Sequence, residues 1–170
     1  MDLLWKKTHL NGIKNNNMKQ ISYYILERLH INKDIDHHNY HPKTRVELIN
    51  IVDQLIKERG KDADLNDIDT SEIKDMNQLF YNSPFNGDIS GWDVSNVKDM
   101  SRMFQYSEFT GENGDISNWD VSNVKIMYCM FYRSPFNGDI FNWDVNNVEN
   151  MDGMLTWAPL EKNPPKWYKE

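Results

Sequence analysis

The sequence predicts an α+β repeat solenoid, in which coils with short parallel strands and short helical turns stack behind capping N-terminal helices. Three observations predict this class. The segment 65–160 consists of four similar copies of one pattern, and apolar residues recur at fixed positions in every copy. An amphipathic helix with clear start and stop signals directly precedes the first copy.

Two helices are expected before the repeat. Residues 19–31 hold apolar side chains at helical spacing and follow an N-terminal arm, 1–17, that ends in three asparagines. The second helix is predicted to end at Arg59, before a capping Gly60. An end coil of a stack exposes its core, so this helix is expected to cover the first copy.

The start of the second helix carries a capping signature. Thr44 followed by Glu47 matches a capping box, with Pro42 just outside the helix. Its buried stripe is expected from apolar residues at helical spacing, namely Val46, Ile49, Val52 (or Leu48), Leu55 and Ile56.

The four copies begin at Leu65, Ile89, Ile116 and Ile140, so their starts are 24, 27 and 24 residues apart. With each copy numbered from 1, apolar residues recur at positions 1, 4, 6, 9, 12, 15, 16 and 21. The alternation at positions 4 and 6 predicts a short strand, with position 5 pointing away from the core. The spacing from position 9 to 16 predicts one tight helical turn. No single coil can bury all these positions, so the coils are expected to stack.

Charge divides the chain near Gly60. The 170 residues carry a formal net charge of −7, of which residues 1–60 contribute +3 and the remainder −10. This change predicts an N-terminal arm and helical cap (1–60), a four-coil solenoid (61–160) and a C-terminal tail or cap (161–170).

The repeat resembles a known family. The stretch Trp-Asp-Val-Ser-Asn-Val-Lys-Asp-Met-Ser-Arg-Met-Phe (92–104), with the closing Phe-Asn-Gly-Asp-Ile of other copies, is similar to BspA-like leucine-rich repeats. The match is to their short-repeat branch of unknown function, found in bacterial surface lipoproteins. The resemblance covers about 65–160. It implies leucine-rich-repeat-like coils used for protein binding or adhesion in a bacterial or phage protein, without catalysis.

The residues do not suggest an enzyme, a metal site or a cofactor. The one cysteine, Cys129, has no histidine in its coil to activate it. The histidine-rich stretch 37–41 lies in a polar linker without metal-ligand spacing and is expected to be a surface loop. No nucleophile elbow, phosphate loop or paired acid motif stands outside the repeat pattern.

Composition limits the location and the partners. The mean hydropathy of −0.77 argues against a membrane span, and no signal peptide or lipid-attachment motif is recognised. The expectation is a cytoplasmic protein with no membrane contact, whose overall acidity argues against direct nucleic-acid binding. The oligomeric state stays open.

Two acidic columns follow from the repeat. Position 5 holds Asp69, Asp93, Asp120 and Asp144, and the residue before position 1 is also Asp in every copy. Unit charges on coils about 4.8 Å apart repel by roughly 0.8 kcal/mol even in water. Either each Asp accepts a backbone N–H in its own turn, or the position-5 column binds a basic partner or a cation.

These columns lead to the functional hypothesis of a non-catalytic protein–protein interaction module that binds a basic protein partner through an acidic strand face. The expected partner-binding residues are Asp69, Asp93, Asp120, Asp144, Asn118, Asn142 and Phe141. An aromatic face on the other side is the alternative interface, with Tyr81, Tyr106, Tyr128, Tyr132 and Trp157.

Two other functions stay open. One is an acidic inhibitor or nucleic-acid mimic that blocks a nucleic-acid-binding host protein, although charges spaced by about 4.8 Å are sparser than the roughly 3.4 Å of a DNA strand. The other is a bacterial surface adhesin.

Overall fold

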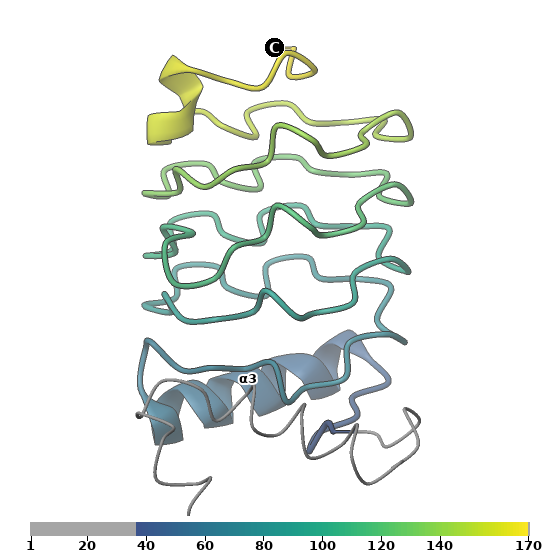
Figure 1. Cartoon of the computed structure of the whole chain (residues 1–170), viewed down its shortest axis with the longest axis vertical. Coiled ribbons are helices and arrows are strands. Elements are labelled where there is room, and N and C mark those ends of the chain that lie inside the picture. The colour runs from purple at the N-terminus through teal and green to yellow at the C-terminus, as the bar shows by residue number, and fades with distance from the viewer. Residues whose placement is uncertain (1–36, 170) are drawn as a thin grey trace, which may run out of the picture. The chain divides into compact units, whose positions relative to one another are not determined.

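The computed structural model describes residues 37–169, and residues 1–36 and 170 are not described. The chain divides into two compact units, Met1–His37 and His38–Glu170, and α3 and the repeat belong to the second (Figure 1). The arm and helix predicted within residues 1–36 lie outside the described residues, and the three-part division of the chain stays a prediction. The described helices are too short and too polar to cross a membrane.

Helix α3 (Arg45–Arg59) begins and ends where the sequence predicts. The Thr44 hydroxyl accepts a hydrogen bond from the Glu47 N–H (3.2 Å), and the Glu47 carboxylate accepts one from the Thr44 N–H (3.3 Å). Gly60 caps the other end with φ of 91°, and its N–H donates to the carbonyl of Ile56 (2.9 Å). The predicted capping box and terminal glycine are therefore confirmed.

The buried face of α3 differs from the predicted stripe at its start. Leu48, Val52 and Leu55 are fully buried, whereas Val46 is 63% exposed. At 3.6 residues per turn, Val46 lies about 200° around the helix from Leu48, on the opposite side. Leu48, the alternative for this stripe, therefore contacts the core.

The predicted fold class, an α+β repeat solenoid, is wrong. The described residues contain one α-helix and one 3₁₀ helix, η1 (Pro159–Lys162), and they form no strand or sheet. Neighbouring copies of the repeat meet only at isolated parallel bridges, such as those joining Asp75 to Asp99 and Asp99 to Ile126. The short strands and helical turns predicted within each copy are β-turns instead.

Each copy is a closed, irregular coil made of consecutive β-turns. The N–H of positions 4, 9 and 15 donates to the carbonyl three residues earlier in the same coil. In the second coil these bonds join Trp92 to Ile89 (3.2 Å), Val97 to Val94 (2.9 Å) and Met103 to Met100 (3.2 Å). Apolar pairs therefore stand at the two ends of each turn, and their spacing resembles that of a strand or a helix without forming either.

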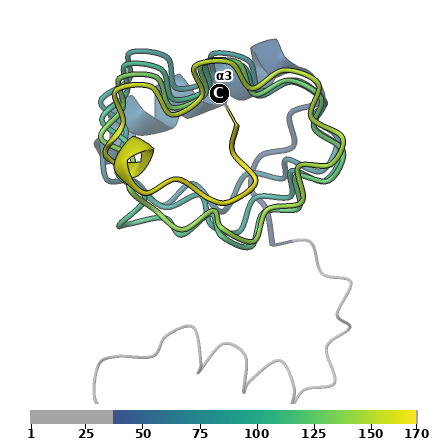
Figure 2. The ribbon, with the colours of Figure 1, turned by 90° about the horizontal axis from the view of Figure 1, so that it is seen from above.

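Successive coils lie on one another (Figure 1) and superpose when viewed along the stack (Figure 2). Positions 11–18 form what we call the stacking edge. There the N–H of positions 12, 14, 16 and 18 donates to the carbonyls of positions 11, 13, 15 and 17 in the next coil. Between the second and third coils, these bonds of 2.8–3.0 Å join Met100 to Ile126, Arg102 to Tyr128, Phe104 to Met130 and Tyr106 to Tyr132.

The apolar columns form the core, as predicted. They are buried in the first three coils, while Val145, Val148 and Met151 of the last coil are only partly buried. Six fully buried phenylalanines at positions 16 and 21 stack with centroids 4.0–6.2 Å apart: Phe80, Phe85, Phe104, Phe109, Phe131 and Phe136. Thr70 replaces valine at position 6, and its hydroxyl donates to the carbonyl of Asp93 (2.9 Å).

The glycine of the Asn-Gly-Asp turn allows the coils to approach each other. A Cβ atom on Gly87 would lie 2.0 Å from the carbonyl oxygen of Ala63, and one on Gly114 would lie 2.7 Å from that of Gly87. Both neighbours are backbone atoms that cannot move aside. This turn therefore tolerates no side chain at these two positions.

The tail after the last coil imitates part of a further coil. In each coil from the second on, the position-4 indole N–H donates to the position-1 carbonyl of the preceding coil, as Trp143 does to Ile116 (3.1 Å). Trp167 donates in the same way to Ile140 (3.3 Å). The tail thus satisfies a carbonyl that a fifth coil would otherwise bind.

Candidate functional site

The position-5 acids stand at a turn of each coil. One carboxylate oxygen of Asp69, Asp93, Asp120 and Asp144 accepts the N–H of the residue two positions later, at 3.0–3.1 Å. Each acid therefore forms an Asx turn, the structural alternative considered above. The side chains of Asp93, Asp120 and Asp144 are nevertheless exposed.

The acids before position 1 and those at position 11 act in the same way. Asp64, Asp88, Asp115 and Asp139 each accept the N–H two residues later at 2.9–3.0 Å. At position 11, Asp75, Asp99 and Asn150 do so at 2.7–3.0 Å. Asn150 shows that this corner does not require a charge, and Ile126, at position 11 of the third coil, shows that the coil also forms there without a side-chain oxygen.

The first coil differs from the others because cations of the preceding segment contact its acids. The ion pairs are Lys43–Glu72 (2.6 Å), Arg45–Asp75 (3.9 Å) and Arg59–Asp67 (2.9 Å). His41 Nδ1 also lies 3.6 Å from Asp69 Oδ2. We call the surface lined by the position-5 acids of the four coils the acidic surface. A basic segment of this chain thus occupies one end of it.

Beyond the first coil, the position-5 acids have no such partner. Among the described residues, no Lys, Arg or His nitrogen lies within 4.0 Å of the carboxylates of Asp93, Asp120 or Asp144. The acidic surface of coils 2–4 therefore presents charge that its own neighbours do not neutralise.

Hydrogen bonding keeps several of these acids ionised. The Ser122 side chain and N–H lower the pKa of Asp120 below its ordinary value. Ser71 lowers the pKa of Asp69, with a smaller contribution from His41. The Arg59 guanidinium, which binds both carboxylate oxygens of Asp67, lowers the pKa of Asp67.

The other predicted contact residues are also accessible. Asn118 and Asn142 are exposed at position 3. Phe141 is 43% exposed, and its N–H donates to Asp139 (2.9 Å). The structure thus brings an exposed aromatic ring and two amides to the corner next to the position-5 acids.

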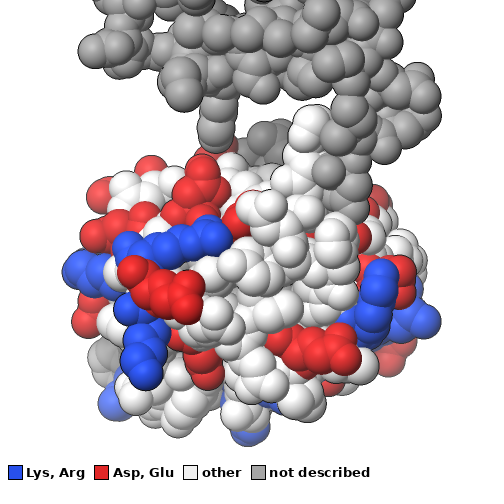
Figure 3. Space-filling model, turned by 90° about the horizontal axis from the view of Figure 1, so that it is seen from below, with Lys and Arg blue, Asp and Glu red and all other residues white. Residues whose placement is uncertain are grey.

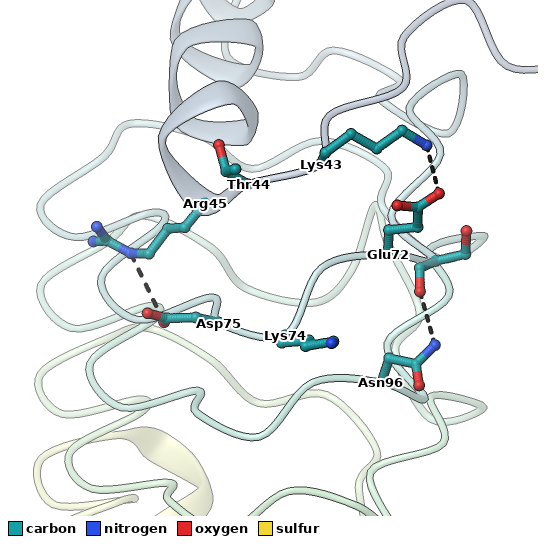
Figure 4. A pocket seen from close by; sticks show the side chains of 8 residues that line it. Lys43, Thr44, Arg45, Glu72, Lys74, Asp75 and Asn96 are labelled. Carbon is teal, nitrogen blue, oxygen red and sulfur yellow. Dashed lines mark hydrogen bonds and ion pairs between the residues drawn. The ribbon is translucent and has the colours of Figure 1, made fainter.

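A hollow of about 450 Å³ opens where the start of α3 meets the first two coils. Its lining residues are Lys43, Thr44, Arg45, Ser71, Glu72, Lys74, Asp75 and Asn96. Figure 4 shows the Lys43–Glu72 and Arg45–Asp75 pairs on its walls and the Asn96 amide bound to the Ser71 carbonyl. The hollow is therefore bounded by ion pairs that join the cap to the repeat.

Basic side chains confine the acidic surface. Position 10 holds Lys74, Lys98 and Lys125, and Lys125 pairs with Glu149 (3.0 Å). At the α3 end of the molecule, positive and negative side chains alternate without a patch of one sign (Figure 3). A basic partner would therefore have to bind at positions 2 to 5 of the coils, away from the lysines at position 10.

The aromatic alternative forms a ridge along the stacking edge. Tyr81, Tyr106 and Tyr132 make edge-to-face contacts with centroids 5.7–5.9 Å apart. The Arg133 guanidinium lies over both Tyr132 (5.6 Å) and Trp157 (5.9 Å). We call these five side chains the aromatic ridge. The sequence predicted its aromatic members but not Arg133, because a single arginine at position 18 gives no recurring signal.

Sequence reasoning also missed the cations of the cap. Lys43, Arg45 and Arg59 were read only as part of a helix and its flank, although the charge imbalance between residues 1–60 and the repeat was their signal. Two residues that the sequence analysis considered as reactive groups are also placed. Cys129 is buried, and His41, from the histidine-rich stretch, lies beside Asp69.

Comparison with known proteins identifies the repeat segment. A family model described as "Mycoplasma protein of unknown function, DUF285" matches residues 46–167. The chain belongs to the DUF285 family. This match covers nearly all of α3, all four coils and most of the tail. Of the resemblance to BspA-like repeats, it supports only the general statement that the chain belongs to a repeat family of unknown function. No significant match was found among curated proteins or among solved structures.

Proposed function

We propose that this DUF285 protein is a non-catalytic interaction module that binds a basic segment of a protein partner through the acidic surface of coils 2–4. The contact residues are Asp93, Asp120 and Asp144, flanked by Asn118, Asn142 and Phe141. The BspA-like resemblance, which implies protein binding or adhesion, supports the same class of function.

One observation carries this proposal. The chain's own basic segment already binds the first coil: His41 lies 3.6 Å from the position-5 acid Asp69, and Lys43, Arg45 and Arg59 pair with neighbouring acids of that coil. The position-5 acid recurs in coils 2–4 with an exposed side chain, whereas positions 3 and 8 hold no acid there. A lysine- or arginine-rich segment of a partner would extend this contact along the stack, with a large contribution to association rate and specificity.

The test exploits the tolerance of the Asx turn for asparagine. The double variant Asp93→Asn/Asp120→Asn keeps the side-chain oxygens that accept N–H bonds, as Asn150 does at position 11. It removes two charges, so we expect about tenfold weaker binding to the captured partner and a weaker salt dependence. The partner is first isolated by affinity capture from cell extract and identified by mass spectrometry.

The matched control is Asp115→Asn/Asp139→Asn, which removes two charges from the other acidic column. Equal binding by wild type and the position-5 double variant would reject the proposal. Competition between the chain and nucleic acid for the same target would instead favour the mimic. A cytoplasmic location accompanies the proposal as an expectation, and recovery at the cell surface on fractionation would favour the adhesin.

A further inference from the structure

The stacking edge of the last coil ends in backbone donors without acceptors. In coils 1–3 the N–H of positions 12, 14 and 16 always donates to the next coil. In coil 4 these positions are Met151, Gly153 and Leu155, and no described residue accepts their N–H groups. Open N–H groups at the edge of a stack are what an added polypeptide segment binds.

The chain covers the rest of this end. The fourth donor of the edge, the Trp157 N–H, is bound by the Glu161 carboxylate (3.0 Å). Leu160 and Ala158 are buried over the core, and the Trp167 indole N–H donates a hydrogen bond to the Ile140 carbonyl. Leu155, at position 16, is fully buried, so the uncovered part is the main-chain edge at positions 12 and 14, and the apolar core is closed.

The aromatic ridge ends at the same place. Trp157 is 68% exposed, the most exposed large apolar side chain of the described residues. Between the preceding coils, a ring at position 17 or 18 contacts a ring or a guanidinium of the neighbouring coil. An added coil would place such a group against Trp157.

A second copy of this chain does not fit the edge. Two copies joined by this edge would face donors with donors. The complementary carbonyl edge belongs to the first coil, where α3 lies against it (Figure 1) and Arg45 donates to the Asn77 carbonyl (2.6 Å). No described residue of this chain therefore supplies the acceptors, and a segment of a different polypeptide fits this edge.

We propose that the stacking edge of coil 4 binds a segment of another protein that adopts the coil conformation of this repeat. The segment would supply two alternate carbonyls to Met151 and Gly153 and an aromatic or arginine side chain to Trp157. Its position 14 would adopt positive φ, as Gln78, Arg102 and Cys129 do. This surface is separate from the acidic surface, and the two proposals fail independently.

The probe is a synthetic peptide copying residues 94–110, which span positions 6–22 of the second coil. It is added to the full chain, and amide hydrogen exchange is followed by NMR. We expect exchange at Met151 and Gly153 to slow by about tenfold at saturation. The Met127, Cys129 and Phe131 amides, already bonded to coil 4, serve as internal controls.

Two peptide variants test the conformation. Arg102→Gly favours positive φ and should bind more tightly than the native peptide, whereas Arg102→Val opposes it and should bind about tenfold more weakly. In the chain, Trp157→Ala should weaken binding without changing the exchange of the control amides.

Several results would overturn the inference. They are no binding at about 1 mM peptide, equal binding of the two peptide variants, or binding that leaves the Met151 and Gly153 amides unprotected. Protection of the same amides on raising the chain's own concentration, without peptide, would assign the edge to a second copy and would also overturn it.

Discussion

At the residue scale, the coils depend on backbone conformations that most residues avoid. Positions 14 and 18 have φ between 52° and 65° in every coil, and only position 14 of the last coil, Gly153, is a glycine. The others are Gln78, Arg102, Cys129, Asn82, Tyr106, Arg133 and Trp157. Each non-glycine residue there costs about 1 kcal/mol, less for asparagine, so the stack carries strain that its packing must offset.

Replacing one of these residues by glycine should therefore stabilise the protein. Gln78 has φ of 56° and an exposed side chain without a hydrogen bond among the described residues. We expect Gln78→Gly to raise the free energy of unfolding by about 0.5–1 kcal/mol, because the relief of strain exceeds the entropy cost of glycine. Urea denaturation measures this change.

The control for this prediction is Lys98→Gly. Lys98 is exposed and does not have positive φ. The same substitution there should destabilise the protein by up to about 1 kcal/mol, since only the entropy cost remains. A loss of stability in both variants would show that positive φ at position 14 is not a source of strain.

At the element scale, the confirmed predictions are those based on sequence patterns that are compatible with only one local structure. The capping box of Thr44 and Glu47 located the start of α3, and the columns of apolar residues located the core. The strand and helical turn within each coil were wrong because an apolar pair at the ends of a β-turn has the spacing of a helix. The backbone hydrogen bonds within and between the coils distinguish these alternatives.

The candidate site shows the same limit. The repeat phase placed the acids of position 5 on one column, but it did not separate their turn-forming role from a partner-binding role. The geometry shows that one oxygen of each acid binds backbone. It also shows that α3 and its flank bind the first coil through cations, which requires knowledge of how distant segments pack.

The ion pair between Arg59 of α3 and Asp67 of the first coil should make the stability of the protein depend on pH. Arg59 binds both oxygens of Asp67 at 2.9 Å and lowers its pKa below the ordinary 3.8. The contact therefore contributes fully above pH 3.8 and is lost as the pH falls through the lower folded-state pKa. We expect Asp67→Asn to cost about 1 kcal/mol at pH 7 and progressively less at acid pH.

Denaturation of wild type and variant from pH 7 to acid pH measures this difference. Asp62→Asn is the control, because Asp62 is exposed and has no ion pair among the described residues. A difference between wild type and Asp67→Asn that stays constant with pH would contradict the assignment of the pKa shift to Arg59.

At the scale of the whole molecule, each coil contacts only its neighbours. The stacking edge, the indole bonds and the phenylalanine column all join one coil to the next. Stability in such a stack is a sum of nearest-neighbour terms, so equal changes at an inner and an outer coil have different consequences. The two ends are closed differently, by α3 below and by the tail above.

The indole bonds allow this to be tested with one substitution at two places. Trp143 and Trp167 each donate to a position-1 carbonyl, of Ile116 and Ile140, but Trp143 is buried inside the stack and Trp167 belongs to the tail. Trp143→Phe should lower the free energy of global unfolding by about 0.5–1.5 kcal/mol, because it removes a buried hydrogen bond to the Ile116 carbonyl, which then keeps only the bond from the Trp119 N–H. Trp167→Phe should leave global unfolding nearly unchanged and speed amide exchange only in coil 4. Urea denaturation combined with native-state hydrogen exchange measures both effects, and an equal loss of global stability in the two variants would show that the coils unfold as a single cooperative unit.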